Sequence, residues 1–196
     1  MDNTNIKLQV IIGSVRPTRF GDKPAHWILG EAKKIDGVDV ELVDLKEWAI
    51  PSFTRAASPS TAKDGYGDEK ADAFAKKIAE ADAYIIVTPE YNHGYPGSLK
   101  DALDAIYKEW NNKPVAFVGY GSVGGARSIE QLRQVAIELQ MAPIRAAVHL
   151  PSEVYMAVMK ETVPADSALF APVAQKATDM LAQLMWWARA LKVARQ

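Results

Sequence analysis

Short apolar runs typical of buried strands alternate along this chain with segments whose apolar residues recur at helical spacing. The run Ile6–Ile12 is rich in β-branched residues and closes on Gly13 and Ser14, as expected of a strand that enters a sheet core. Further strands are predicted at residues 38–43, 83–87, 115–118 and 144–150. This alternation requires right-handed crossovers and a mainly parallel sheet covered on both faces by helices.

The helices between these strands are predicted from their apolar stripes. They are expected at residues 25–35, at 68–80, from Gly97 through Leu99, Leu103, Ile106 and Trp110, at 129–139, and from about 167 to 193. Five such units fit one α/β domain over residues 1–196, a flavodoxin-like three-layer sandwich with strand order 2-1-3-4-5. Ligands of this fold lie outside the carboxyl ends of the strands, so the loops after Ile12, Val87 and Val118 are the candidate site.

Composition excludes several functional classes. A formal net charge of -1 provides no general attraction for nucleic acid or an anionic membrane, so we expect neither as a partner. Without cysteine the chain has no thiolate nucleophile and no dithiol pair, and redox chemistry would require a bound cofactor. Because Met1 to Lys7 is polar and no run of about 20 apolar residues occurs, we expect a cytoplasmic protein.

Neither the histidines nor the serines predict a metal centre or a nucleophile. His26, His93 and His149 are scattered over a predicted helix, a loop and a strand end, without metal-ligand spacing. We therefore expect no metal site. Ser14 and Ser122 lie outside a Gly-x-Ser-x-Gly pattern, which favours hydrogen bonding as their role.

The first candidate loop, residues 13–21, contains two arginines and two hydroxyls between a strand and a helix. Free amides at a helix start, together with Arg16 or Arg19, would bind a phosphate. The loop lacks both the Gly-x-Gly-x-x-Gly fingerprint and the Walker pattern, which argues against a Rossmann dinucleotide site and a P-loop. Taken alone, the loop is either an anion site or a solvated connection.

The second candidate loop, residues 88–104, is a more specific signal for a ligand site than the first. Two prolines and two glycines, Pro89, Gly94, Pro96 and Gly97, restrict its path, while tyrosine and asparagine side chains provide aromatic faces and amide groups. Such a loop suits a flat heteroaromatic ring, because polar donors can contact the ring edge while aromatic side chains pack on its face.

Three motifs resemble the NADPH-dependent FMN reductase and quinone reductase family of flavodoxin-like proteins: residues 13–16, residues 89–96 and residues 119–122. The resemblance implies that an FMN phosphate and the start of its ribityl chain contact Ser14, Arg16, Thr18, Arg19 and Phe20. It implies that the isoalloxazine edge contacts Pro89, Glu90, Tyr91 and Asn92, and that its pyrimidine end contacts Gly119, Tyr120, Gly121 and Ser122. For Glu90, two orientations stay open: toward solvent or toward a dimer partner.

The resemblance also implies a reaction. NADPH or NADH would transfer hydride to the flavin N5 and leave, after which a small acceptor would take the same place in ping-pong order. The acceptor would be a free flavin, a quinone, an azo compound or a metal oxyanion. The alternatives are a flavodoxin-like electron carrier and an FMN-binding or cofactor-free regulatory module without nicotinamide turnover. A net charge of -1 does not supply the acidic surface expected of an electron carrier.

Relatives in this family are commonly homodimers or homotetramers, and the predicted helix from Gly97 has an apolar band that includes Tyr107 and Trp110. Either the band pairs with a second copy, or Tyr107 and Trp110 cover the sheet edge within one chain. Two long irregular stretches, residues 46–67 and 151–166, are expected to be functional or interfacial, or else surface segments with a short helix.

Overall fold

The computed structural model describes residues 5–196, so the first four residues of the polar amino-terminal segment lie outside the described part. Its parallel sheet has the order β2-β1-β3-β4-β5, with β6 also paired to β4. The long strands are β1 (Ile6–Ile12), β2 (Val38–Asp44), β3 (Ala83–Pro89) and β4 (Pro114–Tyr120). In this register Val10 of β1 lies opposite Leu42 of β2 and Ile85 of β3. The predicted α/β class and strand order are confirmed.

The fifth strand differs from its prediction. A single strand over residues 144–150 is wrong: β5 (Ala142–Pro143) and β6 (Val148–His149) are two short segments, each parallel to β4. Side chains from other elements form hydrogen bonds with the backbone groups that lie between β5 and β6. Ala146 donates its N–H to Gln183 at 2.8 Å, and Arg133 donates to the carbonyl of Arg145 at 3.0 Å. These groups therefore cannot continue the ladder.

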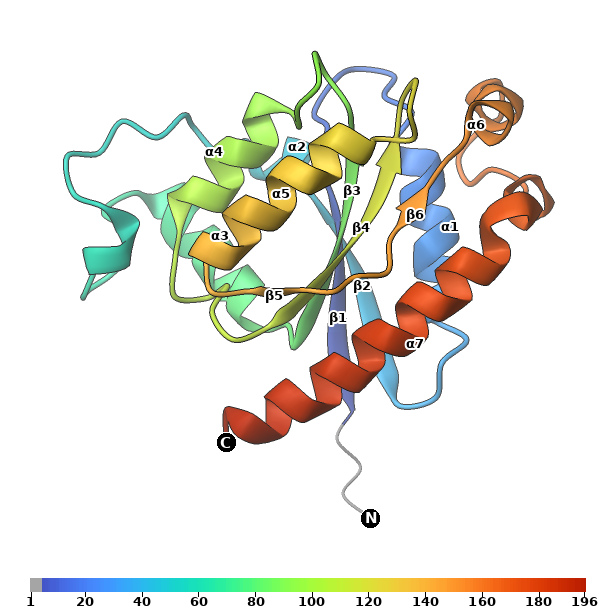
Figure 1. Cartoon of the computed structure of the whole chain (residues 1–196). Helices are drawn as coiled ribbons and strands as arrows, with labels where there is room; N and C mark the ends of the chain where they lie inside the picture. Colours follow the sequence, from blue (N-terminus) through green and yellow to red (C-terminus); the bar gives the residue numbers. More distant parts are fainter. Residues whose placement is uncertain (1–4) are drawn as a thin grey trace.

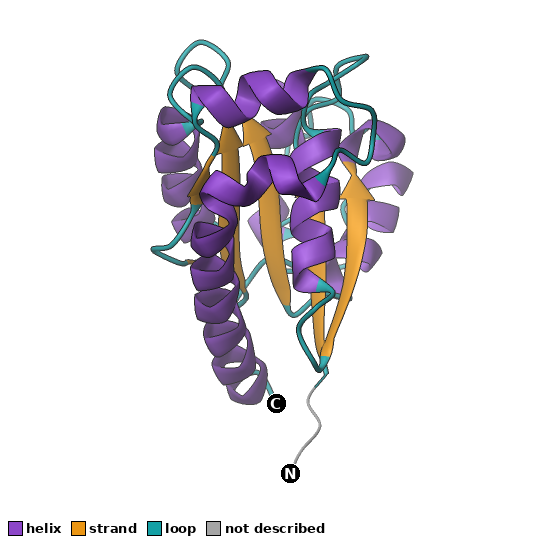
Figure 2. Cartoon of the chain, turned by 90° about the vertical axis from the view of Figure 1, so that its right-hand side faces the viewer, coloured by secondary structure: helices purple, strands orange, loops and turns teal. Residues whose placement is uncertain are grey.

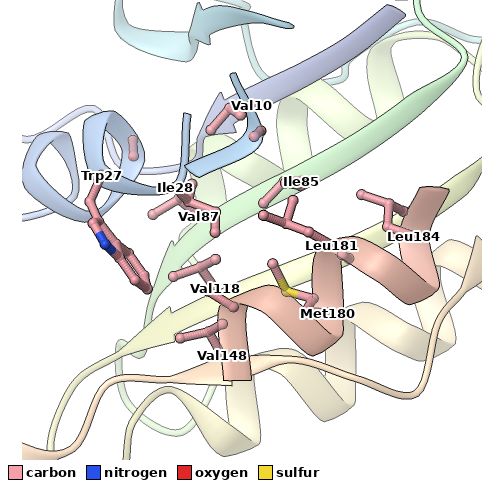
Figure 3. Close-up of a cluster of buried hydrophobic side chains, with 14 of the residues drawn as sticks. Val10, Trp27, Ile28, Ile85, Val87, Val118, Val148, Met180, Leu181 and Leu184 are labelled. Atoms are coloured by element: carbon pink, nitrogen blue, oxygen red, sulfur yellow. The ribbon is translucent and has the colours of Figure 1, made fainter. Parts of the chain in front are cut away.

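Helices cover both faces of the sheet (Figures 1 and 2). One layer contains α1 (Asp22–Ala32) and α7 (Ala171–Ala194), and the other contains α3 (Glu69–Ala79), α4 (Gly97–Ala105) and α5 (Ala126–Glu138). Figure 3 shows Ile28 of α1 and Leu181 of α7 packed against Val87 and Val118 of the sheet. Alternate strand residues belong to the second core, which buries Ile86 and Phe117 under the opposite helices.

The helix from Gly97 is shorter than its apolar pattern predicts. It ends at Ala105, and Ile106 is extended. Distant side chains compete for the backbone there: the Tyr66 hydroxyl accepts the N–H of Tyr107 at 3.0 Å, and Arg55 donates to the carbonyl of Ala105. A helix through Trp110 is therefore wrong.

The apolar band that motivated a dimer is buried within one chain. Leu99, Leu103, Ile106 and Trp110 are each no more than 1% exposed. The Trp110 ring contacts the ring of Tyr84 edge-on, with centroids 5.0 Å apart, and Tyr107 donates its hydroxyl to the carbonyl of Glu138. Of the two readings of this band, coverage of the sheet within the chain is the one observed.

The two long connections contain short helices. Between β2 and α3 lie α2 (Leu45–Trp48), which Figure 1 shows beside the sheet, and η1 (Pro59–Thr61). Between β6 and α7 lie α6 (Ser152–Met159) and η2 (Ser167–Phe170). Within residues 5–196, no helix combines the length and the apolar character needed to cross a membrane.

Candidate functional site

A pocket of about 360 Å³ lies where the loops after β1, β3 and β4 meet. These loops gather at the end of the sheet toward which the strand arrows point in Figure 2, opposite the two termini. Most of the predicted site residues line this pocket, namely Arg16, Thr18, Arg19, Phe20, Pro89, Glu90, Tyr91, Tyr120 and Gly121. The sequence therefore located the pocket, although FMN contacts at these residues remain proposals.

Arg19 is occupied by protein partners. Its guanidinium pairs with Asp44, at the end of β2, and with Asp22 at 2.6 Å, and it donates to the carbonyl of Ser14 at 2.6 Å. Burial alone would raise the pKa of the Asp44 carboxyl, but the hydrogen bonds and charge of Arg19 outweigh it, and that pKa is lowered. Arg19 thus ties the first loop to its neighbouring strand.

Arg16 has a different environment. Its guanidinium carbon lies 5.7 Å from the centre of the Tyr91 ring, and within residues 5–196 no carboxylate forms an ion pair with it. The side chain is exposed at the pocket. Its charge is therefore available to an anionic ligand.

The second loop forms a tight hairpin at its tip. Tyr91 donates its N–H to the carbonyl of Gly94 at 2.8 Å, and Gly94 returns the bond at 3.0 Å. Asn92 and His93 between them have φ values of 49° and 70°, as a two-residue type I′ turn requires. The Tyr91 hydroxyl lies 2.9 Å from the Ser14 hydroxyl, so this hydrogen bond joins the first and second loops.

Glu90 faces neither solvent nor a partner, and both expected orientations are wrong. Its side chain is 4% exposed and pairs with the guanidinium of Arg127, and its carboxylate accepts the Arg127 N–H at 3.1 Å. Burial alone would raise its pKa, but these hydrogen bonds and the charge of Arg127 hold the pKa below its usual value. A carboxylate at the first turn of α5 also stabilises the helix.

The third loop folds closely against its own strand. A Cβ added to Gly119 would lie 2.6 Å from the carbonyl oxygen of Gly124, so only glycine fits there. Gly121, with φ of 137°, lines the pocket beside Tyr120. Burial raises the pKa of the Tyr120 hydroxyl well above its usual value, so this side chain stays protonated.

Four predicted residues do not line the pocket. Ser14 and Gly119 are buried behind it, whereas Asn92 and Ser122 are exposed beyond its rim. Conversely, the lining includes three residues that the sequence reasoning missed: Lys23 of α1, and Tyr155 and Met159 of α6. The spacing of the buried Val154 and Val158 four residues apart was the available signal for α6.

The chemistry of the lining residues fits FMN. Arg16 and the Thr18 hydroxyl form a donor set for a phosphate, while Phe20, Tyr91 and Tyr120 give the pocket aromatic walls suited to a flat ring. The strand order defines a flavodoxin-like α/β protein, and the pocket lies at the switch point where ligands of such sheets bind.

Comparison with known proteins identifies the family. Residues 6–154 match the family model described as NADPH-dependent FMN reductase, and the chain belongs to that family. It is 40% identical over 149 residues to an NAD(P)H-dependent FMN reductase of Schizosaccharomyces pombe, covering 75% of this chain and 74% of the relative. It is 30% identical over 141 residues to an NAD(P)H:quinone oxidoreductase of Solanum tuberosum, covering 69% of this chain and 70% of the relative.

A solved structure agrees with the fold. The flavoenzyme FerB, an NAD(P)H:(acceptor) oxidoreductase from Paracoccus denitrificans, superposes with a TM-score of 0.61 at 23% identity. The match covers 90% of this chain and 97% of that one. These comparisons confirm the family and fold that the three motifs predicted.

Proposed function

We propose that residues 1–196 form one FMN-binding domain that oxidises NADPH or NADH and reduces a small acceptor. The observation that carries this proposal is the Arg16 guanidinium, which has no carboxylate partner among the described residues and lies beside the aromatic walls of the switch-point pocket. Family membership supports the same assignment.

The chain's own residues divide into ligand contacts and supports. Arg16, Thr18 and the loop amides would hold the phosphate, and Pro89, Tyr91, Tyr120 and Gly121 would contact the ring. The supports would be Arg19, which fixes the first loop through Asp44, and Glu90, which fixes the second loop to α5. Phe20 would add a third aromatic wall, and Ser14, Asn92, Gly119 and Ser122 would shape the three loops around these contacts.

Bound FMN would supply the redox chemistry, by accepting hydride from the nicotinamide and passing electrons on to the acceptor. The protein would orient both substrates and exclude water. Tyr120 keeps its proton because it is buried, so it does not act as a general base at neutral pH, and the Glu90 charge is paired with Arg127. A single pocket serves donor and acceptor in turn, and ping-pong order follows.

Free flavins and quinones are the acceptor classes best supported, because a relative at 40% identity is named for FMN reduction and one at 30% for quinone reduction. Azo compounds and metal oxyanions belong to the same proposal as further small acceptors. A homodimer or homotetramer also stays a prediction, to be tested by sedimentation of the FMN-loaded protein.

Steady-state kinetics test the reaction. The FMN-loaded protein, with NADPH and a soluble benzoquinone varied together, should give parallel double-reciprocal lines. Intersecting lines would replace the ping-pong order by a ternary complex. Absence of NADPH and NADH oxidation with every acceptor class would contradict the reductase proposal and favour an electron carrier or regulatory module.

A further inference from the structure

Lys23 is a further cation at the pocket, in addition to Arg16 and the paired Arg19. Its ammonium donates to the backbone carbonyl of Met159 at 2.9 Å and lies 5.8 Å from the centre of the Phe20 ring. Within residues 5–196, no carboxylate forms an ion pair with it. A neutral carbonyl leaves the full positive charge of Lys23 facing the pocket.

Lys23 and Arg16 lie on different walls. Arg16 lies against Tyr91 of the loop after β3, whereas Lys23 reaches the carboxyl end of α6. The Phe20 ring contacts Tyr120 on one side, with centroids 4.9 Å apart, and Tyr155 of α6 at 4.5 Å. Lys23 therefore lies at the α6 side of the pocket, and Arg16 lies at the Tyr91 side.

The surface beside Lys23 is apolar and aromatic. Tyr155 is half-buried with its ring against Phe20, and Met159 is 40% exposed at the pocket. One turn away on the same helix, Met156 is 54% exposed. A tyrosine ring and adaptable methionine side chains suit a flat base such as adenine.

We propose, on the basis of the proposed function, that Lys23 with Tyr155 and Met159 forms a subsite for the 2′-phosphorylated adenosine end of NADPH. The nicotinamide end must reach the ring-binding wall at Tyr91, so the adenosine end lies elsewhere along the pocket. NADPH differs from NADH only in its 2′-phosphate, and an ammonium without a counter-ion favours that group. Lys23 thereby selects NADPH over NADH.

Binding of nucleotide fragments tests this without turnover. Titration calorimetry would compare 2′,5′-ADP with 5′-AMP on the FMN-loaded protein and on two variants. Lys23→Met keeps most of the aliphatic stem and removes the charge. Lys33→Met is the matched control, because Lys33 is an exposed lysine at the carboxyl end of the same helix and does not line the pocket.

The parent and Lys33→Met should bind 2′,5′-ADP about tenfold more tightly than 5′-AMP, as expected for one charge-assisted bond. In Lys23→Met the ratio of the affinity for 2′,5′-ADP to that for 5′-AMP should fall close to one. The ratio of kcat/KM for NADPH to that for NADH should fall by a similar factor.

Two results would overturn the subsite. The first is an unchanged preference for 2′,5′-ADP in Lys23→Met. The second is a loss of FMN affinity in that variant with unchanged riboflavin affinity, which would assign Lys23 to the FMN phosphate. If the fragments behave as expected but NADPH is not oxidised, the reductase proposal fails while the anion subsite stands.

Discussion

The two ends of the sheet both have cations beside a cavity, but they use them differently. At the amino end a cavity of about 730 Å³ is lined by Lys113 and Arg195, and this is twice the volume of the pocket at the carboxyl end. Arg195 pairs there with Asp82 at 3.1 Å, and Lys192 pairs with the same carboxylate at 2.7 Å. Lys113 donates to the carbonyls of Ile78 and Ala79 and to the Tyr84 hydroxyl.

At the carboxyl end, Arg16 and Lys23 have no carboxylate partners among the described residues, and glycines allow the backbone to approach closely. The cations of the amino end hold the last turns of α3 and α7 to the sheet. The two ends therefore differ in how their cations are held: Lys113 is buried and donates to three protein acceptors, whereas Arg16 is exposed at its pocket.

The contrast between the two arginines of the first loop gives the largest expected effect. Arg19→Ala leaves Asp44 and Asp22 without their cation and should lower the free energy of unfolding by about 3 kcal/mol. Because the loop loosens as a whole, affinity for FMN and for riboflavin should fall together. Urea denaturation and flavin titration measure both. Unchanged stability with a loss of FMN affinity alone would show that Arg19 binds the phosphate.

Arg16→Ala should weaken FMN binding by about 1.5–3 kcal/mol through the loss of charge-assisted phosphate bonds. Riboflavin lacks the phosphate and should bind the variant and the parent almost equally. The free energy of unfolding should stay nearly unchanged, because the Arg16 side chain is exposed. An equal loss for both flavins would mean that Arg16 does not bind phosphate.

At the amino end, the buried Lys113 makes stability depend on pH. Burial, assisted by the charge of Arg195, lowers its pKa to about 8. Between this value and its unfolded pKa of about 10.4, the unfolded chain holds more protons, so stability rises with pH.

From pH 7.5 to 9.5 the gain should be about 2 kcal/mol, and Lys113→Met should lack it. Urea denaturation across this pH range measures the difference between the parent and the variant. If the free energy of unfolding still rises with pH in Lys113→Met, another titratable group is responsible for the rise.

Much of the fold was predictable because β3 and β4 are nearly continuous apolar runs and β1 is rich in β-branched residues, which the sequence displays directly. The failures have long-range causes. The fifth strand is interrupted by Gln183 and Arg133, and the helix from Gly97 is ended by Tyr66 and Arg55, all of them distant in the sequence. Local sequence patterns do not show which distant side chain will form a hydrogen bond with a given backbone group.

The candidate site was likewise predictable from local sequence only in part. The three loops were predictable because strand ends of a doubly wound sheet meet at one edge. The different roles of Arg16 and Arg19 were not, since they depend on Asp44, which the parallel pairing of β1 with β2 brings beside the loop. Lys23, Tyr155 and Met159 were missed because they become neighbours only once α6 lies over the start of α1.

Flavin titration measures whether the carboxyl end of the sheet binds FMN. Addition of the purified protein to FMN at micromolar concentration should quench the flavin fluorescence to a stoichiometric end point and leave the protein yellow. Riboflavin should bind more weakly than FMN. The difference in binding free energy should equal the FMN binding free energy that Arg16→Ala loses. An FMN fluorescence that stays unquenched at these concentrations would contradict the account.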